Sequence, residues 1–75
     1  MDNNHELNEK LAKNLTYYRK VAGFTQAELA ERSGVSLRSI QMYEQRNKNI
    51  NKAGADTVYR LAKSLGCSME ELIEK

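Results

Sequence analysis

Hydrophobic residues recur at intervals of three or four positions along most of the chain, which is the spacing of amphipathic helices. The first stripe predicts a helix of about fifteen residues that ends at Gly23. Its apolar positions are Leu7, Leu11, Leu15, Tyr18 and Ala22. No segment has the alternating pattern of a strand, so the chain is predicted to be all-α, with five helices.

Two short helices are predicted in the middle of the chain. Thr25, with a glutamate three residues later, has the spacing of a capping box that begins the first of them. Gly34 ends this helix, because glycine adopts a positive φ at a helix C-terminus at little cost. Ser36 is the expected N-cap of the next helix, which is predicted to run to Gln45 or Arg46.

The last third of the chain predicts a loop and two further helices. The polar segment "RNKNINK" is expected to be a loop, with Ile50 reaching into the core. A fourth helix is predicted to start at Gly54 or a neighbour and to end at Gly66. Ser68, again with a glutamate three residues later, begins the last helix. The buried stripe of the fourth helix is predicted to comprise Thr57, Val58, Leu61, Ala62 and Leu65.

The two central helices and the turn between them have the features of a helix-turn-helix. Ala30 is small where the two helices approach most closely, and Gly34 makes the turn four residues later. Val35 is expected to fill the corner, and Ile40 to point back and hold the pair together. The combination of these residues, between two capped helices, predicts this supersecondary motif.

The length of 75 residues allows one domain with a thin core. Residues 1–6 are expected to form a flexible N-terminal tail, and residues 7–75 the domain. With 40% hydrophobic residues and no proline, the composition suits a compact helical fold and argues against a large enclosed cavity. The single cysteine excludes an internal disulfide and fits a reducing compartment.

Positive charge is concentrated in the middle of the chain, although the net charge is only +2. Residues 36–52 contain Arg38, Arg46, Lys48 and Lys52 but only one acid, Glu44. Such a local excess suits a polyanionic partner, and a solvated basic loop would have the same composition.

Several function classes are excluded or disfavoured by composition. One histidine, one cysteine and no convergent pair of carboxylates leave no credible nucleophile–base set, so no enzymatic activity, metal, cofactor or small-molecule substrate is expected. The apolar runs are too short to cross a membrane, and the polar N-terminus is unlike a signal peptide. We therefore expect a cytoplasmic protein with no membrane partner.

The segments "LTYYRKVAGFTQAELAERSGVSLRSIQMYEQ" and "TVYRLAKSLGCSMEELIE", in this order, resemble the Cro/cI-type, or XRE, family of helix-turn-helix regulators. The resemblance spans about Lys10 to Glu74. It implies a compact five-helix, lambda-repressor-like fold whose third helix lies in the DNA major groove.

The resemblance also implies which residues contact bases. These are Leu37, Arg38, Gln41 and Met42. Arg38 is expected to pair bidentately with guanine, Gln41 to pair with adenine, and the two apolar side chains to contact a thymine methyl group. From the residues alone, Arg38 is equally well a solvated helix residue, Met42 half-buried packing, and Gln41 a residue that only flanks the groove.

A second set of residues is expected to contact phosphates. Thr25 and Gln26 match phosphate-binding residues at the start of the second helix, where unpaired N–H groups and the helix dipole favour an anion. Arg19 matches a residue that reaches phosphate while it bridges to Glu44. The remaining expected phosphate contacts are Ser36, Ser39, Arg46, Lys48 and Lys52.

The chain departs from the family pattern after the third helix. The family usually has a glycine and, a few residues later, a proline, where this chain has Arg46 and Ile50. Asn47 is expected to supply the left-handed residue instead. The path of the loop over residues 46–53 is therefore left open by the sequence.

The resulting hypothesis is a sequence-specific regulator of transcription, a repressor that binds double-stranded DNA as a homodimer on an inverted repeat. The family implies a dimer surface on the last helix and neighbouring residues, with Leu72, Ile73 or Met69 partly exposed. The alternative is an antitoxin or adaptor that uses the same fold to bind a protein partner. The absence of an acid between Ser36 and Met42 disfavours that alternative.

Overall fold

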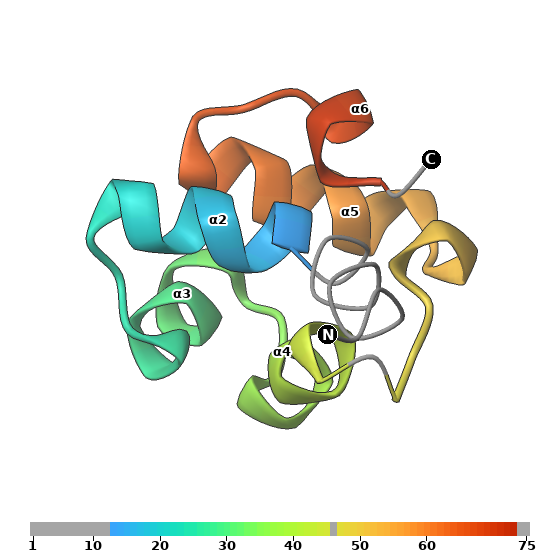
Figure 1. The fold of residues 1–75 in the computed structure, drawn as a ribbon, viewed down its shortest axis with the longest axis horizontal. Coiled ribbons are helices and arrows are strands. Elements are labelled where there is room, and N and C mark those ends of the chain that lie inside the picture. The colour runs from blue at the N-terminus through green and yellow to red at the C-terminus, as the bar shows by residue number, and fades with distance from the viewer. Residues whose placement is uncertain (1–12, 46, 74–75) are drawn as a thin grey trace, which may run out of the picture.

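The computed structural model describes residues 13–45 and 47–73, and this part of the chain consists of helices and their connections, without a strand (Figure 1). The helices are α2 (Lys13–Ala22), α3 (Gln26–Ser33), α4 (Leu37–Glu44), α5 (Ala55–Leu65) and α6 (Met69–Leu72). A 3-10 turn, η1 (Ile50–Lys52), precedes α5. The all-α prediction is thus confirmed, while the predicted tail and the start of the first helix lie outside the described residues.

The predicted caps begin the helices as expected. The side-chain hydroxyl of Thr25 accepts a hydrogen bond from the Glu28 backbone N–H at 3.0 Å, and the Glu28 carboxylate accepts one from the Thr25 N–H at 2.8 Å. Ser68 and Glu71 form the same reciprocal pair at the start of α6. Because each box involves residues only three positions apart, local sequence was enough to locate it.

Gly34 ends α3 in the left-handed conformation, with φ +76°. Its N–H donates to the Ala30 carbonyl at 2.9 Å, and the chain turns directly into α4, whose N-cap is Ser36. A residue with a Cβ is strained at such a φ, so glycine is the residue that this corner needs.

The core lies where all five helices meet. Its buried residues are Leu15, Leu29, Val35, Ile40, Ile50, Val58, Leu61, Ala62 and Leu72. Val35, Ile40 and Ile50 therefore occupy the positions predicted for them. Two members of the predicted α5 stripe, Thr57 and Leu65, are only partly buried, because they lie in the first and last turns of the helix, where fewer neighbours cover them.

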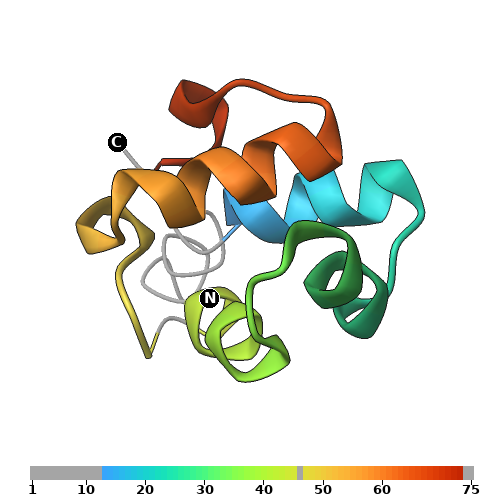
Figure 2. The same ribbon diagram turned by 180° about the vertical axis from the view of Figure 1, so that it is seen from behind.

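The arrangement of the helices separates two faces of the molecule (Figures 1 and 2). α2 and α5 cross the centre, α6 packs on both of them, and α4 lies at the opposite side of the molecule from α6. In the described part of the chain, no helix is long and apolar enough to span a membrane.

The sequence left open which of Leu72, Ile73 or Met69 is partly exposed, and Leu72 is not. It is fully buried in the core, where α6 packs on α2 and α5. Met69 and Ile73 are half-buried and pack against the same core. Leu72 can therefore offer no area to a second copy unless the domain rearranges.

The segment after α4 differs from a simple loop. The carbonyl of Met42, in the last turn of α4, accepts hydrogen bonds from the N–H groups of Asn47 and Lys48, at 2.8 and 3.1 Å. Asn49 then caps η1, and its side-chain oxygen accepts from the Asn51 N–H at 2.9 Å. The left-handed conformation expected of Asn47 remains a prediction.

Candidate nucleic-acid interface

The outer face of α4 carries the four residues that were predicted to contact bases. Leu37 and Arg38 are exposed, and Gln41 and Met42, one turn further along the helix, are half-buried. On the opposite face, Ile40 is fully buried. Residues four positions apart lie on the same face of a helix, so Leu37 lies beside Gln41 and Arg38 beside Met42, and these two neighbouring rows form one surface.

This surface has a mixed apolar and polar character without negative charge. The only acidic residue of α4 is Glu44, at its C-terminal end, and that carboxylate points away from the surface into a set of hydrogen bonds. Leu37 keeps 39% of its area exposed, which is high for a leucine in a small domain. The face can accept hydrogen-bonding and apolar contacts from an electron-rich partner.

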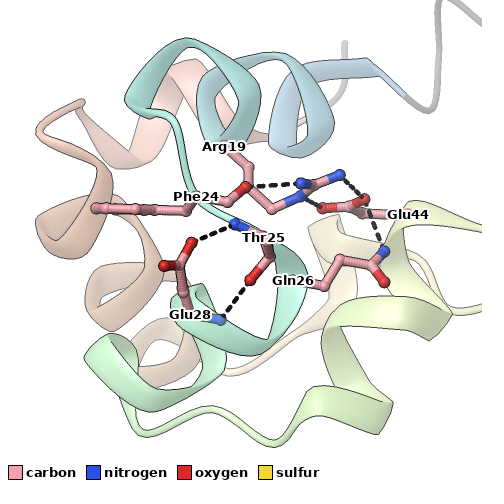
Figure 3. Close-up of polar contacts among 6 residues, drawn as sticks. All are labelled: Arg19, Phe24, Thr25, Gln26, Glu28 and Glu44. Atoms are coloured by element: carbon pink, nitrogen blue, oxygen red, sulfur yellow. Dashed lines mark hydrogen bonds and ion pairs between the residues drawn. The ribbon is translucent and has the colours of Figure 1, made fainter.

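Glu44 is the acceptor at the centre of a cluster that joins three helices (Figure 3). Its Oε2 accepts from Arg19 Nε at 2.7 Å, and its Oε1 accepts from Arg19 Nη2 at 3.0 Å. Gln26 Nε2 donates to the same Oε1 at 2.9 Å, and Arg19 Nη1 donates to the Phe24 carbonyl at 2.8 Å. The Arg19–Glu44 bridge expected from the resemblance is thus present.

The cluster is largely removed from solvent, with the Arg19 and Glu44 side chains 12% and 6% exposed. Burial alone raises the pKa of Glu44, but hydrogen bonds from Arg19 and Gln26 and the charge of Arg19 outweigh it and hold the pKa below its ordinary value. Glu44 is therefore ionised at neutral pH, and the pair holds α4 against α2 at a fixed position.

A carboxylate of the chain itself already lies at the N-terminus of α3. The Glu28 carboxylate accepts a hydrogen bond from the Thr25 N–H, and the Thr25 hydroxyl accepts one from the Glu28 backbone N–H. A phosphate at this end would share the helix N-terminus with that carboxylate. The Gln26 amide is directed at Glu44 rather than outward, so both residues are near the predicted place but already engaged (Figure 3).

Ser36 and Ser39 lie together at the start of α4. The Ser36 hydroxyl accepts from the Ser39 N–H at 3.1 Å and donates to the Ser39 hydroxyl oxygen at 2.9 Å. The Ser39 hydroxyl proton is the one left to donate to a partner. Of the two serines, Ser39 is thus the better placed to contact a phosphate oxygen.

Of the basic residues after α4, Lys48 lies next to this helix. Lys48 and Lys52 are exposed, and the Lys48 ammonium lies 5.8 Å from the centre of the Tyr43 ring. This cation–π contact directs the lysine along α4. Arg46, also predicted to contact phosphate, lies outside the described residues.

Sequence reasoning missed the link between Gln26 and Glu44. The two residues are 18 positions apart, and a hydrogen bond over that distance depends on how the helices pack. A polar residue at the first position of a helix is ordinary, so no local signal would have shown its partner.

A protein-family model described as Helix-turn-helix matches residues 15–72, which is most of the chain and includes α3 and α4. No curated protein and no solved structure shows significant similarity to the chain.

Proposed function

Because the chain belongs to the Cro/cI-type helix-turn-helix family of DNA-binding regulators, with its lambda-repressor-like fold, we propose that it is a sequence-specific transcriptional repressor. It binds an inverted repeat in double-stranded DNA as a homodimer, with half-sites about one helical turn, roughly 34–36 Å, apart. The observation that carries this proposal is the exposed, acid-free face of α4, supported from behind by the Arg19–Glu44 pair.

In this proposal α4 is the recognition helix and lies in the major groove. Arg38 donates two hydrogen bonds to guanine O6 and N7, and Gln41 pairs with adenine. Leu37 and Met42 contact thymine methyl groups, which suits their partial exposure. Each good bidentate contact contributes about 1–3 kcal/mol of discrimination between bases.

Phosphate contacts set the position of the helix in the groove. Lys48 and Lys52 contribute charge, and the hydroxyl of Ser39 and the first turn of α3 contribute neutral donors. Arg19 uses three of its five N–H donors inside the cluster, so it reaches phosphate only with the remaining two. Thr25, Gln26 through its backbone N–H at the helix N-terminus, Ser36 and Arg46 complete the proposed set.

The proposed dimer uses the last helix, α6, and the residues next to it. Met69 and Ile73 keep part of their area accessible there, whereas Leu72 is withdrawn into the core. In a two-fold dimer the same surface of each copy is in contact, so the two recognition helices are related by the same two-fold axis as the half-sites of an inverted repeat. We further propose a cytoplasmic location and no enzymatic activity.

The proposed function is tested by selecting ligands for the purified protein from random duplex DNA at about 0.15 M salt, where non-specific attraction is partly screened. The expected result is an enriched palindrome with half-sites one helical turn apart. Enrichment of a single half-site would contradict the homodimer, and no enrichment by folded protein would contradict sequence recognition and favour a protein partner.

A further inference from the structure

Helices α3 and α4 are joined at only one of their ends. The turn at Gly34 connects the last residue of α3 to the start of α4, so the backbone does not link the other two ends of these helices directly. Those ends are Gln26, the first residue of α3, and Glu44, the last residue of α4. The Gln26–Glu44 hydrogen bond of 2.9 Å joins them and closes a triangle.

The position of this bond gives it a large effect on the angle between the helices. Each helix has eight residues, about 12 Å of length at 1.5 Å per residue. A change of about 10° at the turn moves the far end by about 2 Å, which exceeds the distance range of an N–H···O hydrogen bond. The hydrogen bond therefore restrains this angle, because a larger change requires the two side chains to change conformation.

We propose that Gln26 is a positioning residue that sets the angle of the recognition helix α4 against α3 by donating to Glu44. The inference rests on the proposed function, and it assigns the Gln26 side chain a role other than contact with phosphate. Arg19 holds the same carboxylate against α2, so Glu44 joins the end of α4 to both neighbouring helices.

The hydrogen bonds that Glu44 accepts support this positioning role of Gln26. Glu44 Oε1 accepts from both Arg19 and Gln26, in a place where little water reaches it. If Gln26 turned outward to a phosphate, a buried carboxylate oxygen would lose a donor, which is unfavourable. The hydrogen bond from Gln26 is also one of the causes that hold down the pKa of Glu44.

The test replaces Gln26 with methionine, which keeps the length of the side chain and removes its amide. Residual dipolar couplings of the backbone amides, measured without DNA, report the angle between α3 and α4. The dissociation constant for the selected duplex is measured for Gln26→Met alone, for Glu44→Ala alone and for the two together. Gln45→Ala, which removes an exposed glutamine at the end of α4, is the matched control.

The proposal predicts that Gln26→Met changes the angle, that Gln45→Ala does not, and that Gln26→Met weakens DNA binding about three- to tenfold, as expected for the loss of one hydrogen bond. In the Glu44→Ala background the same substitution has no further effect, because its partner is already gone. An unchanged angle, or an equal loss of affinity in both backgrounds, overturns the proposal; the second result indicates direct contact with phosphate.

Two other outcomes are also decisive. If the wild-type protein binds no duplex, the proposed function fails, and the angle between α3 and α4 still decides whether Gln26 positions α4. If Glu44→Ala does not fold, the dipolar couplings of Gln26→Met decide in the same way.

Discussion

Arg38 lies exposed in the first turn of α4, without an acidic residue near it in the sequence between Ser36 and Met42. Arg38→Ala is expected to relax specificity at one base-pair position in each half-site, at a cost of about 1–3 kcal/mol in binding the preferred base. Repeating the duplex selection with the variant measures this. An unchanged site preference would show that Arg38 does not contact a base.

Glu44 makes the stability of the domain depend on pH. Its folded-state pKa lies below its ordinary value, so its contribution is present above the unfolded pKa and is lost as the pH falls through the folded pKa. Glu44→Gln is therefore expected to lower the free energy of unfolding at pH 7, with a difference from wild type that narrows below about pH 4.

Urea denaturation at pH 7 and at about pH 3 measures that difference. Glu31→Gln, at an exposed position on α3, is the control for the loss of one carboxylate. If the difference in the free energy of unfolding between wild type and Glu44→Gln is the same at both pH values, this result contradicts the role assigned to the ionised Glu44.

At the scale of the elements, the corner between α3 and α4 depends on one backbone conformation. Gly34→Ala places a Cβ at φ +76° and 3.3 Å from Arg60 Nη1, and is expected to destabilise the domain by about 1–2 kcal/mol. Gly23→Ala meets a similar φ of +81° in open space, so it separates backbone strain from the contact with Arg60.

Thermal or urea unfolding of both variants gives the stabilities, and duplex binding gives the functional effect. We expect similar backbone strain in the two variants, and reduced DNA affinity only in Gly34→Ala, because only that turn sets the position of α4. A Gly34→Ala variant as stable as wild type would show that the corner tolerates another conformation.

Elements were predictable from the sequence where their signals are local. The two capping boxes and the glycine at the corner act within three or four residues, and each was found where the sequence placed it. The short η1 turn was missed, since its sequence is that of an ordinary polar loop. The sequence did not show which residue of α6 is buried, because the burial of Leu72 depends on packing against helices distant in sequence.

The candidate site likewise has features that the sequence predicted and features that it did not. The four residues on the face of α4 and the Arg19–Glu44 pair both followed from the family resemblance. The engagement of Gln26 with Glu44, and the competition between Glu28 and a phosphate at the start of α3, required the packed structure.

At the scale of the whole molecule, the charge beside α4 is expected to control the salt dependence of binding. Lys48→Ala should weaken binding to all sequences and reduce the slope of log K against log salt by about one unit, since one phosphate contact is lost. Titrations of a duplex at several salt concentrations measure the slope.

The chain offers a matched control for this variant. The Lys63 ammonium lies 5.8 Å from the centre of the Tyr59 ring, and the Lys48 ammonium lies at the same distance from the centre of the Tyr43 ring. Lys63 and Tyr59 belong to α5, whereas Tyr43 belongs to α4. Lys63→Ala should leave the slope unchanged. Equal changes in the two variants would indicate a general effect of net charge and would contradict a phosphate contact by Lys48.

The central claim, that α4 is the part of the molecule that enters the DNA, is tested most directly by NMR. The ¹⁵N-labelled protein is titrated with a duplex that carries the selected site, and the backbone amides and the Arg38 side chain are followed. We predict the largest shifts in residues 37–42 and at the start of α3, with small shifts in α6 beyond those of dimer formation. Shifts confined to the α2 and α6 side, with α4 unaffected, would contradict the account.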